Sequence, residues 1–180
     1  MDLINSYAIV AYVAGPIARF ADRLRADLVP GTPYHAHITI LPPRSLCCSP
    51  SEAMEFTRQL VAQFEPFEVR IGKVEVFEST KVMYLSLASG ICELQAMHDL
   101  LNTGCMEQQE MYEYVPHLTL GQELPPECFD GCLETCRRRL EELGSSGLVR
   151  IETLTFVRQR VDGQWENLAE LALGQVGARI

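Results

Sequence analysis

One seven-residue pattern occurs twice in the sequence, and it limits what the chain can fold into more than any other feature. The segments Tyr34–Ile40 and Tyr114–Leu120 both read Y-x-x-H-φ-T-φ, where φ is an aliphatic residue, and they lie 80 residues apart. Gly15 and Gly90, 75 residues apart, each end an apolar run and begin a stretch with helical spacing. The repeat therefore predicts an internal duplication, in which two β-α-β units form two lobes related by a pseudo-two-fold axis.

Hydrophobic periodicity and turn residues predict the same order of elements in both halves of the chain. The expected strands cover residues 6–13, 35–41, 67–77, 81–88, 115–120, 148–158 and 164–173, and the expected helices cover about 15–28, 49–64, 90–101 and 127–143. The predicted fold class is α+β, with antiparallel-rich sheets, helices outside and a central cleft lined by the two H-x-T strands. The chain forms one domain, 1–180, whose lobes are about 1–78 and 79–180, with exchange of strands between them allowed.

Composition limits the partners of this protein. The 180 residues carry a net charge of −9 and an estimated pI of 4.9, which disfavours a protein that neutralises many phosphates of a long duplex. No run reaches the roughly 20 apolar residues that span a bilayer, and the apolar N-terminal run lacks the basic lead of a signal peptide. We therefore expect a cytoplasmic, monomeric protein with reduced cysteines, no membrane contact and a small phosphorylated ligand.

The repeated motif places chemistry on one face of each strand. Side chains alternate along a strand, so His37 and Thr39 point to one side while the neighbouring isoleucines point to the other, and His117 and Thr119 repeat the arrangement. A pseudo-two-fold axis brings two imidazoles and two hydroxyls together. One neutral histidine can accept a proton and one protonated histidine can donate one, while the threonines hydrogen-bond phosphate oxygens.

With these motifs and this order of elements, the chain resembles the 2H phosphoesterase superfamily, and within it the 2′-5′ RNA ligase-like branch of RNA 2′,3′-cyclic phosphodiesterases. The resemblance implies catalytic roles for His37 and His117, and phosphate binding by Thr39 and Thr119. It implies metal-independent opening of a 2′,3′-cyclic phosphate, on an RNA 3′ end or a small nucleotide, to a 2′-phosphate with no cofactor. The first histidine would protonate the leaving oxygen and the second would activate water, although pseudo-symmetry permits the reverse.

Further substrate-binding candidates surround the motifs. Gly121 and Gln122 follow the second motif where a phosphate-binding arginine would be useful, so the nearest basic candidates are Arg44, Arg158 and Arg160. Tyr34 and Tyr114 could stack on a base or pack beneath the motifs.

Two other functions fit the same residues. The chain could be a non-catalytic module that binds a nucleotide or phosphate, or His35, His37 and His117 could bind zinc in a hydrolase. The zinc reading is weaker because no carboxylate or cysteine completes the ligand set, so no metal is expected. His98 is expected to be a solvated surface residue, and the acidic residues Glu107, Glu110 and Glu113 a solvated loop.

Overall fold

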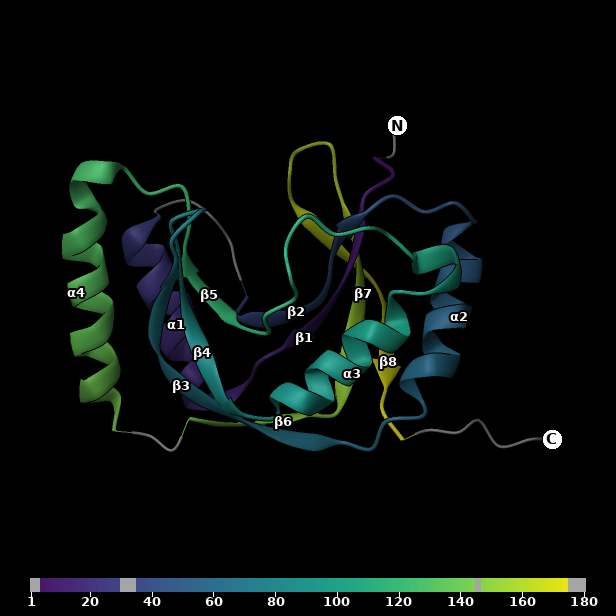
Figure 1. Ribbon diagram of the computed structural model, residues 1–180, viewed down its shortest axis with the longest axis horizontal. Helices are drawn as coiled ribbons and strands as arrows, with labels where there is room; N and C mark the ends of the chain where they lie inside the picture. The colour runs from purple at the N-terminus through teal and green to yellow at the C-terminus, as the bar shows by residue number, and fades with distance from the viewer. Residues whose placement is uncertain (1–3, 30–34, 145–146, 175–180) are drawn as a thin grey trace.

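The computed structural model describes residues 4–29, 35–144 and 147–174, and its strands form one curled antiparallel sheet (Figure 1). The eight described strands are ordered β6-β3-β4-β5-β2-β1-β7-β8, and every neighbouring pair is antiparallel. The strands are β1 (Tyr7–Tyr12), β2 (His37–Arg44), β3 (Phe67–Phe77), β4 (Val82–Ser89), β5 (Leu118–Gly121), β6 (Leu148–Ile151), β7 (Thr153–Gln159) and β8 (Trp165–Ala172). The predicted α+β class is confirmed, but the strands form one continuous sheet and not a separate sheet in each half.

The strand order places the two halves of the chain around the junction of β2 and β5. Each of these strands carries one motif, and each is flanked by the strand that precedes it in its own half, β1 beside β2 and β4 beside β5. The strands one place further out come from the opposite half of the chain. Strand β3 of the first half pairs with β4, and β7 of the second half pairs with β1. The division into two lobes stays a prediction, and this crossing is the strand exchange that it allowed.

Helices cover the face of the sheet that carries the aliphatic motif residues, opposite to the motif histidines and threonines. In Figure 1, α1 (Gly15–Leu28) and α4 (Pro126–Leu143) pack together on the left, and α2 (Pro50–Val61) and α3 (Ile91–Leu101) pack together on the right. A short 3₁₀ turn, Gly104–Met106, follows α3. Helix α1 contacts β5 and helix α3 contacts β2, so each motif strand is packed against the first helix of the other half.

The ends of these helices follow from their local sequence. Ser49 and Glu52 form a reciprocal capping box at the start of α2, with the Ser49 backbone N–H donating to Glu52 Oε2 over 2.9 Å.

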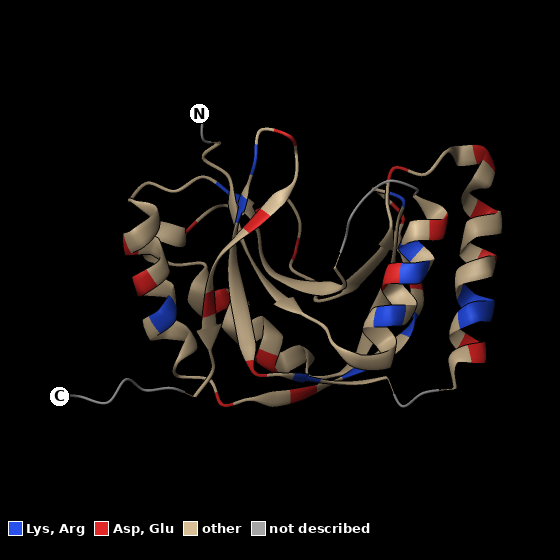
Figure 2. Cartoon of the chain, turned by 180° about the vertical axis from the view of Figure 1, so that it is seen from behind, with Lys and Arg blue, Asp and Glu red and all other residues tan. Residues whose placement is uncertain are grey.

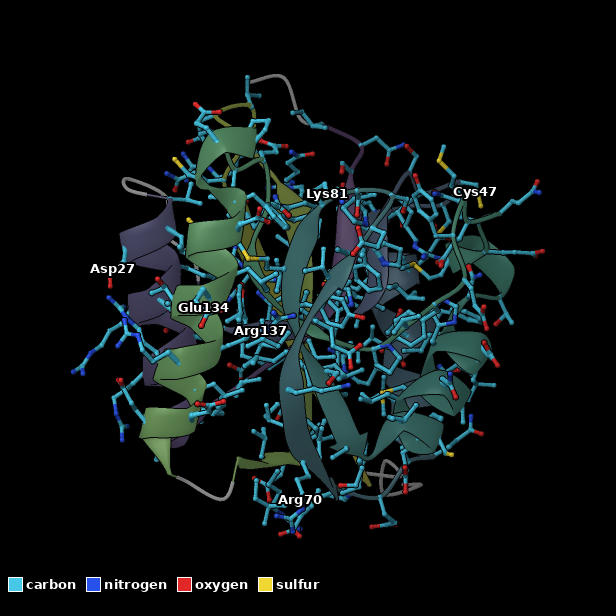
Figure 3. The ribbon with its side chains drawn as sticks, turned by 60° about the vertical axis from the view of Figure 1, so that its left-hand side comes forward. Asp27, Cys47, Arg70, Lys81, Glu134 and Arg137 are labelled. Atoms are coloured by element: carbon cyan, nitrogen blue, oxygen red, sulfur yellow. The ribbon has the colours of Figure 1, made fainter. Side chains whose placement is uncertain are left out.

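Figure 3 shows Asp27, on α1, beside α4, where its carboxylate accepts a hydrogen bond from Arg139.

The core lies between the sheet and the helices, and the motifs contribute to it directly. The aliphatic partners Ile38, Ile40, Leu118 and Leu120 are all fully buried. Each buried side chain of this size contributes roughly 1.5–3 kcal/mol to folding. The alternation therefore anchors both motif strands through one face and leaves the other face for polar groups.

Two predicted elements differ from the structure. The sequence predicted that the strand ends before Pro42 and Pro43, but β2 continues through both prolines. Strand β5 pairs with β2 only near Ile38, so the prolines, which have no N–H group to donate, lie outside the β2–β5 ladder. The predicted strand 148–158 is two strands separated at Glu152, because β6 pairs with β3 near one edge of the sheet and β7 pairs with β1 near the other.

Gly15 and Gly90 offer a matched test of the strand-to-helix turns, because both have φ of +80°. A Cβ at Gly90 would lie 2.7 Å from Val69 Cγ2, whereas nothing lies within 4 Å of one at Gly15. We expect Gly15→Ala to lower the free energy of unfolding by about 1 kcal/mol for the positive φ alone, and Gly90→Ala by roughly 2–3 kcal/mol because the clash is added. Urea unfolding measures both values, and equal losses would contradict the packing described for Gly90.

Candidate active site

The pairing of β2 with β5 brings the two motifs together. Ile38 pairs with Leu118 in an antiparallel register. Extending that register by one residue on each side places His37 opposite Thr119 and Thr39 opposite His117. Directly opposed Cβ atoms in such pairs are about 4.5–5.5 Å apart and diagonal ones about 7–8 Å, so the histidines lie diagonally across a small polar patch.

Both motif histidines are held in the same way by their own backbone. Nδ1 of His37 lies 2.8 Å from the carbonyl oxygen of His35, and Nδ1 of His117 lies 2.7 Å from the carbonyl oxygen of Val115. A carbonyl oxygen can only accept, so Nδ1 carries the proton that it donates. In each neutral ring Nε2 is therefore the basic nitrogen and is available for proton transfer.

Burial lowers the pKa of both histidines. Loss of solvent around each partly buried ring is the largest cause, and the backbone hydrogen bond to each Nδ1 partly opposes it. The positive charges of Arg25 and of protonated His117 lower the pKa of His37 further. Both rings are thus mainly neutral at pH 7, and each becomes protonated at a lower pH than an unperturbed imidazole does.

A cleft of about 430 Å³ opens over the first motif, and His37, Thr39 and Thr119 line it. Its floor is apolar and comes from β1 and β7, while Trp165 contributes an aromatic side chain from β8. Tyr12 also lines the cleft; its ring meets His37 edge-on at 6.2 Å, and its hydroxyl donates to Asn167 over 2.8 Å.

His117 has a different aromatic surrounding. Phe77 and Tyr84 stack on each other at 4.1 Å, and their centroids lie 4.9 and 5.2 Å from the His117 ring. On this side a second cavity of about 540 Å³ lies between β3, β4 and α3, and it is lined in part by Tyr84 and Val115. This second cavity is thus lined by Tyr84, which contacts the His117 ring, but not by the motif histidines and threonines themselves.

The polar lining residues of the first cleft that the sequence analysis did not propose as site residues include Tyr12, Arg25, Gln122 and Gln164. Arg25 is buried on α1, and its Nη1 donates to the carbonyl oxygen of Thr119 over 2.9 Å. The helical spacing of the sequence could have indicated that Arg25 is buried. It lies four residues after Ala21 and one after Leu24, which places it on the buried face of α1. A charged residue at such a position needs a buried partner or a ligand.

Arg44 is buried and does not line the first cleft, which corrects its prediction as a substrate-binding residue. Its side chain has no exposed surface, and its donors go to Glu110, Asn102 and backbone carbonyls. Tyr114 is corrected in the same sense, because its hydroxyl donates to the carbonyl oxygen of Thr39 over 2.9 Å and its ring is covered by His98. Of the two readings left open for this tyrosine, packing beneath the motif is the one observed.

Arg158 and Arg160 are not among the residues that line the first cleft. Arg158 pairs with Glu166 at 2.7 Å, and it follows the buried Phe156 by two residues, on the face opposite the cleft-lining Val157. Arg160 is half exposed in the β7–β8 hairpin and pairs with Asp162 at 3.0 Å. Tyr34 lies outside the described residues.

The described part of the chain contains no group of three His, Cys, Asp or Glu side chains close enough to hold a metal ion, and His35, His37 and His117 do not form one. Within the same residues, no helix combines the length and apolar character needed to cross a membrane.

Comparison with known proteins identifies a family and several relatives that match this chain over different lengths. The sequence model of the 2′-5′ RNA ligase superfamily matches residues 13–163. A protein of Halalkalibacterium halodurans, provisionally named a phosphoesterase, is 23% identical over 94% of this chain and 98% of its own length. A similarly named protein of Oceanobacillus iheyensis is 32% identical over 84 residues, so the matched part spans about half, 49%, of that relative.

Solved structures share the fold. LigT of Escherichia coli in complex with 3′-AMP matches with a TM-score of 0.64 and 16% identity, over 95% of this chain and 99% of LigT. Usb1 of Kluyveromyces marxianus matches with a TM-score of 0.59 and 13% identity, over 94% of this chain and 98% of Usb1. At these identities the likeness establishes the fold alone.

The position of Arg25 predicts a selective change in the proton affinity of His37. We expect Arg25→Gln to raise the pKa of His37 toward its ordinary value, because a positive charge is removed, and to leave the pKa of His117 little changed. NMR titration of the imidazole signals measures both values. An equal rise at the two histidines, or no rise at His37, would contradict the described geometry.

Proposed function

The chain belongs to the 2′-5′ RNA ligase superfamily of two-histidine phosphoesterases, and from that premise we propose that it opens a 2′,3′-cyclic phosphate to a 2′-phosphate. The observation that carries the proposal is the β2–β5 register, which sets two histidines and two threonines on one face of the sheet. In each histidine, Nδ1 donates to a backbone carbonyl oxygen. In each ring, Nε2 is therefore the nitrogen that is available for proton transfer.

The reaction needs one proton removed and one proton supplied. One neutral imidazole takes a proton from water as the water oxygen bonds to phosphorus. The other imidazole, protonated, gives its proton to the 3′ oxygen as the P–O3′ bond breaks. The product is a 2′-phosphate with a free 3′-hydroxyl, and the two histidines have exchanged protonation states.

Thr39 and Thr119 are proposed to hold the phosphate. A hydroxyl beside each histidine can donate to a non-bridging oxygen, which fixes the phosphorus in line between the two Nε2 atoms. Arg25 lines the same cleft and adds a positive charge near the developing negative charge. An anionic substrate in turn favours protonation of one of the two desolvated imidazoles.

A small nucleotide, or the 3′ end of an RNA carrying a cyclic phosphate, is the proposed substrate. Structures of the related LigT contain 3′-AMP and phosphate, which supports a nucleotide ligand for this fold. The net charge of −9, and the mixing of basic and acidic residues along α1 and α4 in Figure 2, support a short substrate end over a long duplex.

The first prediction of this mechanism concerns the histidines. We expect His37→Ala and His117→Ala each to lower kcat for 2′,3′-cyclic nucleotides by about 10²–10⁴-fold, since each removes a proton-transfer group. Turnover measured with EDTA present is expected to persist in the wild type.

The outcomes separate the rival functions. Loss of wild-type activity in EDTA would indicate a metal hydrolase. Nucleotide binding without turnover, retained in His37→Ala, would indicate a binding module.

A second prediction assigns the acid and the base. A nitrophenyl phosphodiester has a leaving group that needs no proton, so the variant that lacks the acid is expected to keep most of its activity on it while the variant that lacks the base does not. The family resemblance assigns the acid to His37, whereas the charge of Arg25 favours a neutral, basic His37. Equal losses for both variants on this substrate would contradict a division into acid and base.

A further inference from the structure

A chain of buried polar contacts lies behind the first motif. Tyr114 donates its hydroxyl to the carbonyl oxygen of Thr39 over 2.9 Å. The Tyr114 ring stacks on His98, with centroids 4.1 Å apart and planes inclined by only 6°. Burial, with the negative charge of Glu110, raises the pKa of Tyr114 far above its usual value, so the hydroxyl remains a donor at every physiological pH.

His98 is enclosed, which corrects its prediction as a solvated surface residue. Its side chain is 9% exposed, with Nδ1 3.0 Å from Asp99 and Nε2 3.1 Å from Glu110. Both ring nitrogens of His98 therefore lie within hydrogen-bond distance of a carboxylate oxygen.

Glu110 continues the chain to Arg44, and it is not the solvated loop residue that the sequence predicted. The carboxylate meets the Arg44 guanidinium at 2.5 Å, and the two side chains are 14% and 0% exposed. Arg44 also donates to Asn102 over 2.6 Å and to the carbonyl oxygen of Met106 over 2.7 Å. Since Arg44 and Thr39 both belong to β2, the contacts begin and end on the first motif strand.

The contacts connect this strand to the segment that delivers the second histidine. Glu110 and Tyr114 belong to residues 107–116, which lead directly into His117, and Val115 in that segment accepts the hydrogen bond from His117 Nδ1. Anchoring the segment to β2 at two points therefore fixes the direction from which His117 reaches the patch. On the other side, the Arg25 bond to the Thr119 carbonyl ties α1 to the second motif.

We propose that Arg44, Glu110, His98 and Tyr114 form a positioning brace that sets the placement of His117 relative to His37 and Thr39. The inference rests on the proposed function, and none of the four residues is proposed to touch substrate. Burying four polar groups costs free energy that apolar packing would not, and the brace joins the Thr39 backbone in the first motif to Tyr114, the first residue of the second motif. These two facts assign it to the geometry of proton transfer, where a displacement of about 1 Å can cost up to 10²-fold in rate.

Tyr114→Phe tests the brace, because it keeps the ring and removes only the donor to Thr39. We expect kcat to fall by about tenfold while KM changes by less than about twofold, since binding groups remain and only alignment is lost. Tyr112→Phe is the matched control, because Tyr112 lies in the same segment and is 61% exposed. The control is expected to leave kcat unchanged.

Glu110→Gln provides a second variant that keeps the shape and removes the charge. It is expected to lower kcat in the same way, and the double variant with Tyr114→Phe is expected to lose less than the product of the two single effects, because both act through one brace. A multiplicative loss would mean that the two residues act independently and would overturn the proposal.

Imidazole titrations of the free protein separate this proposal from the proposed function. Tyr114→Phe is expected to shift the NMR signals or titration midpoints of His37 and His117, and Tyr112→Phe is not. If the thermal midpoint falls while kcat, the pH profile and both titrations stay unchanged, the contacts only stabilise the fold and the brace is wrong. If the wild type turns over no cyclic phosphate, the proposed function fails, and the titrations still decide the brace.

Discussion

The antiparallel pairing of Ile38 with Leu118 is the contact on which the rest of the site depends. It joins the two halves of the chain at the middle of the sheet, with the aliphatic motif residues on the core side and the polar ones on the other. A slip of one residue would turn every side chain of a strand to the opposite face and would bury a histidine and a threonine. The hydrophobic core therefore enforces the register that the proposed chemistry uses.

The surroundings of the two motif histidines differ. Both rings use the same local device, a bond from Nδ1 to the carbonyl two residues earlier. Arg25 adds a positive charge near His37, whereas aromatic rings pack around His117. Acid–base catalysis by two identical side chains requires environments that favour different protonation states. The repeated motif supplies matching groups, and unmatched neighbours supply the difference between them.

The residues that the sequence misplaced share one cause. Arg44, His98 and Glu110 are charged or polar, and the average behaviour of such residues is to lie in solvent. Each is buried here because its partners come from other elements: β2, α3 and the segment before His117. A buried polar group is tolerated only when all its partners are present, and those partners are separated by up to 66 residues in sequence. No local pattern encodes such a set.

The sequence by itself determined the elements and the polar face of each motif strand, because alternation, capping and glycine turns are local effects. His37, Thr39, His117 and Thr119 were identifiable for the same reason. Tertiary structure alone decided that one sheet runs through both halves and that residues 148–158 divide between two distant strands. It also decided that Arg25 lines the cleft while Arg44 is buried against Glu110. These outcomes depend on which strands pair and which buried charges meet, and both are settled by contacts between residues far apart in the chain.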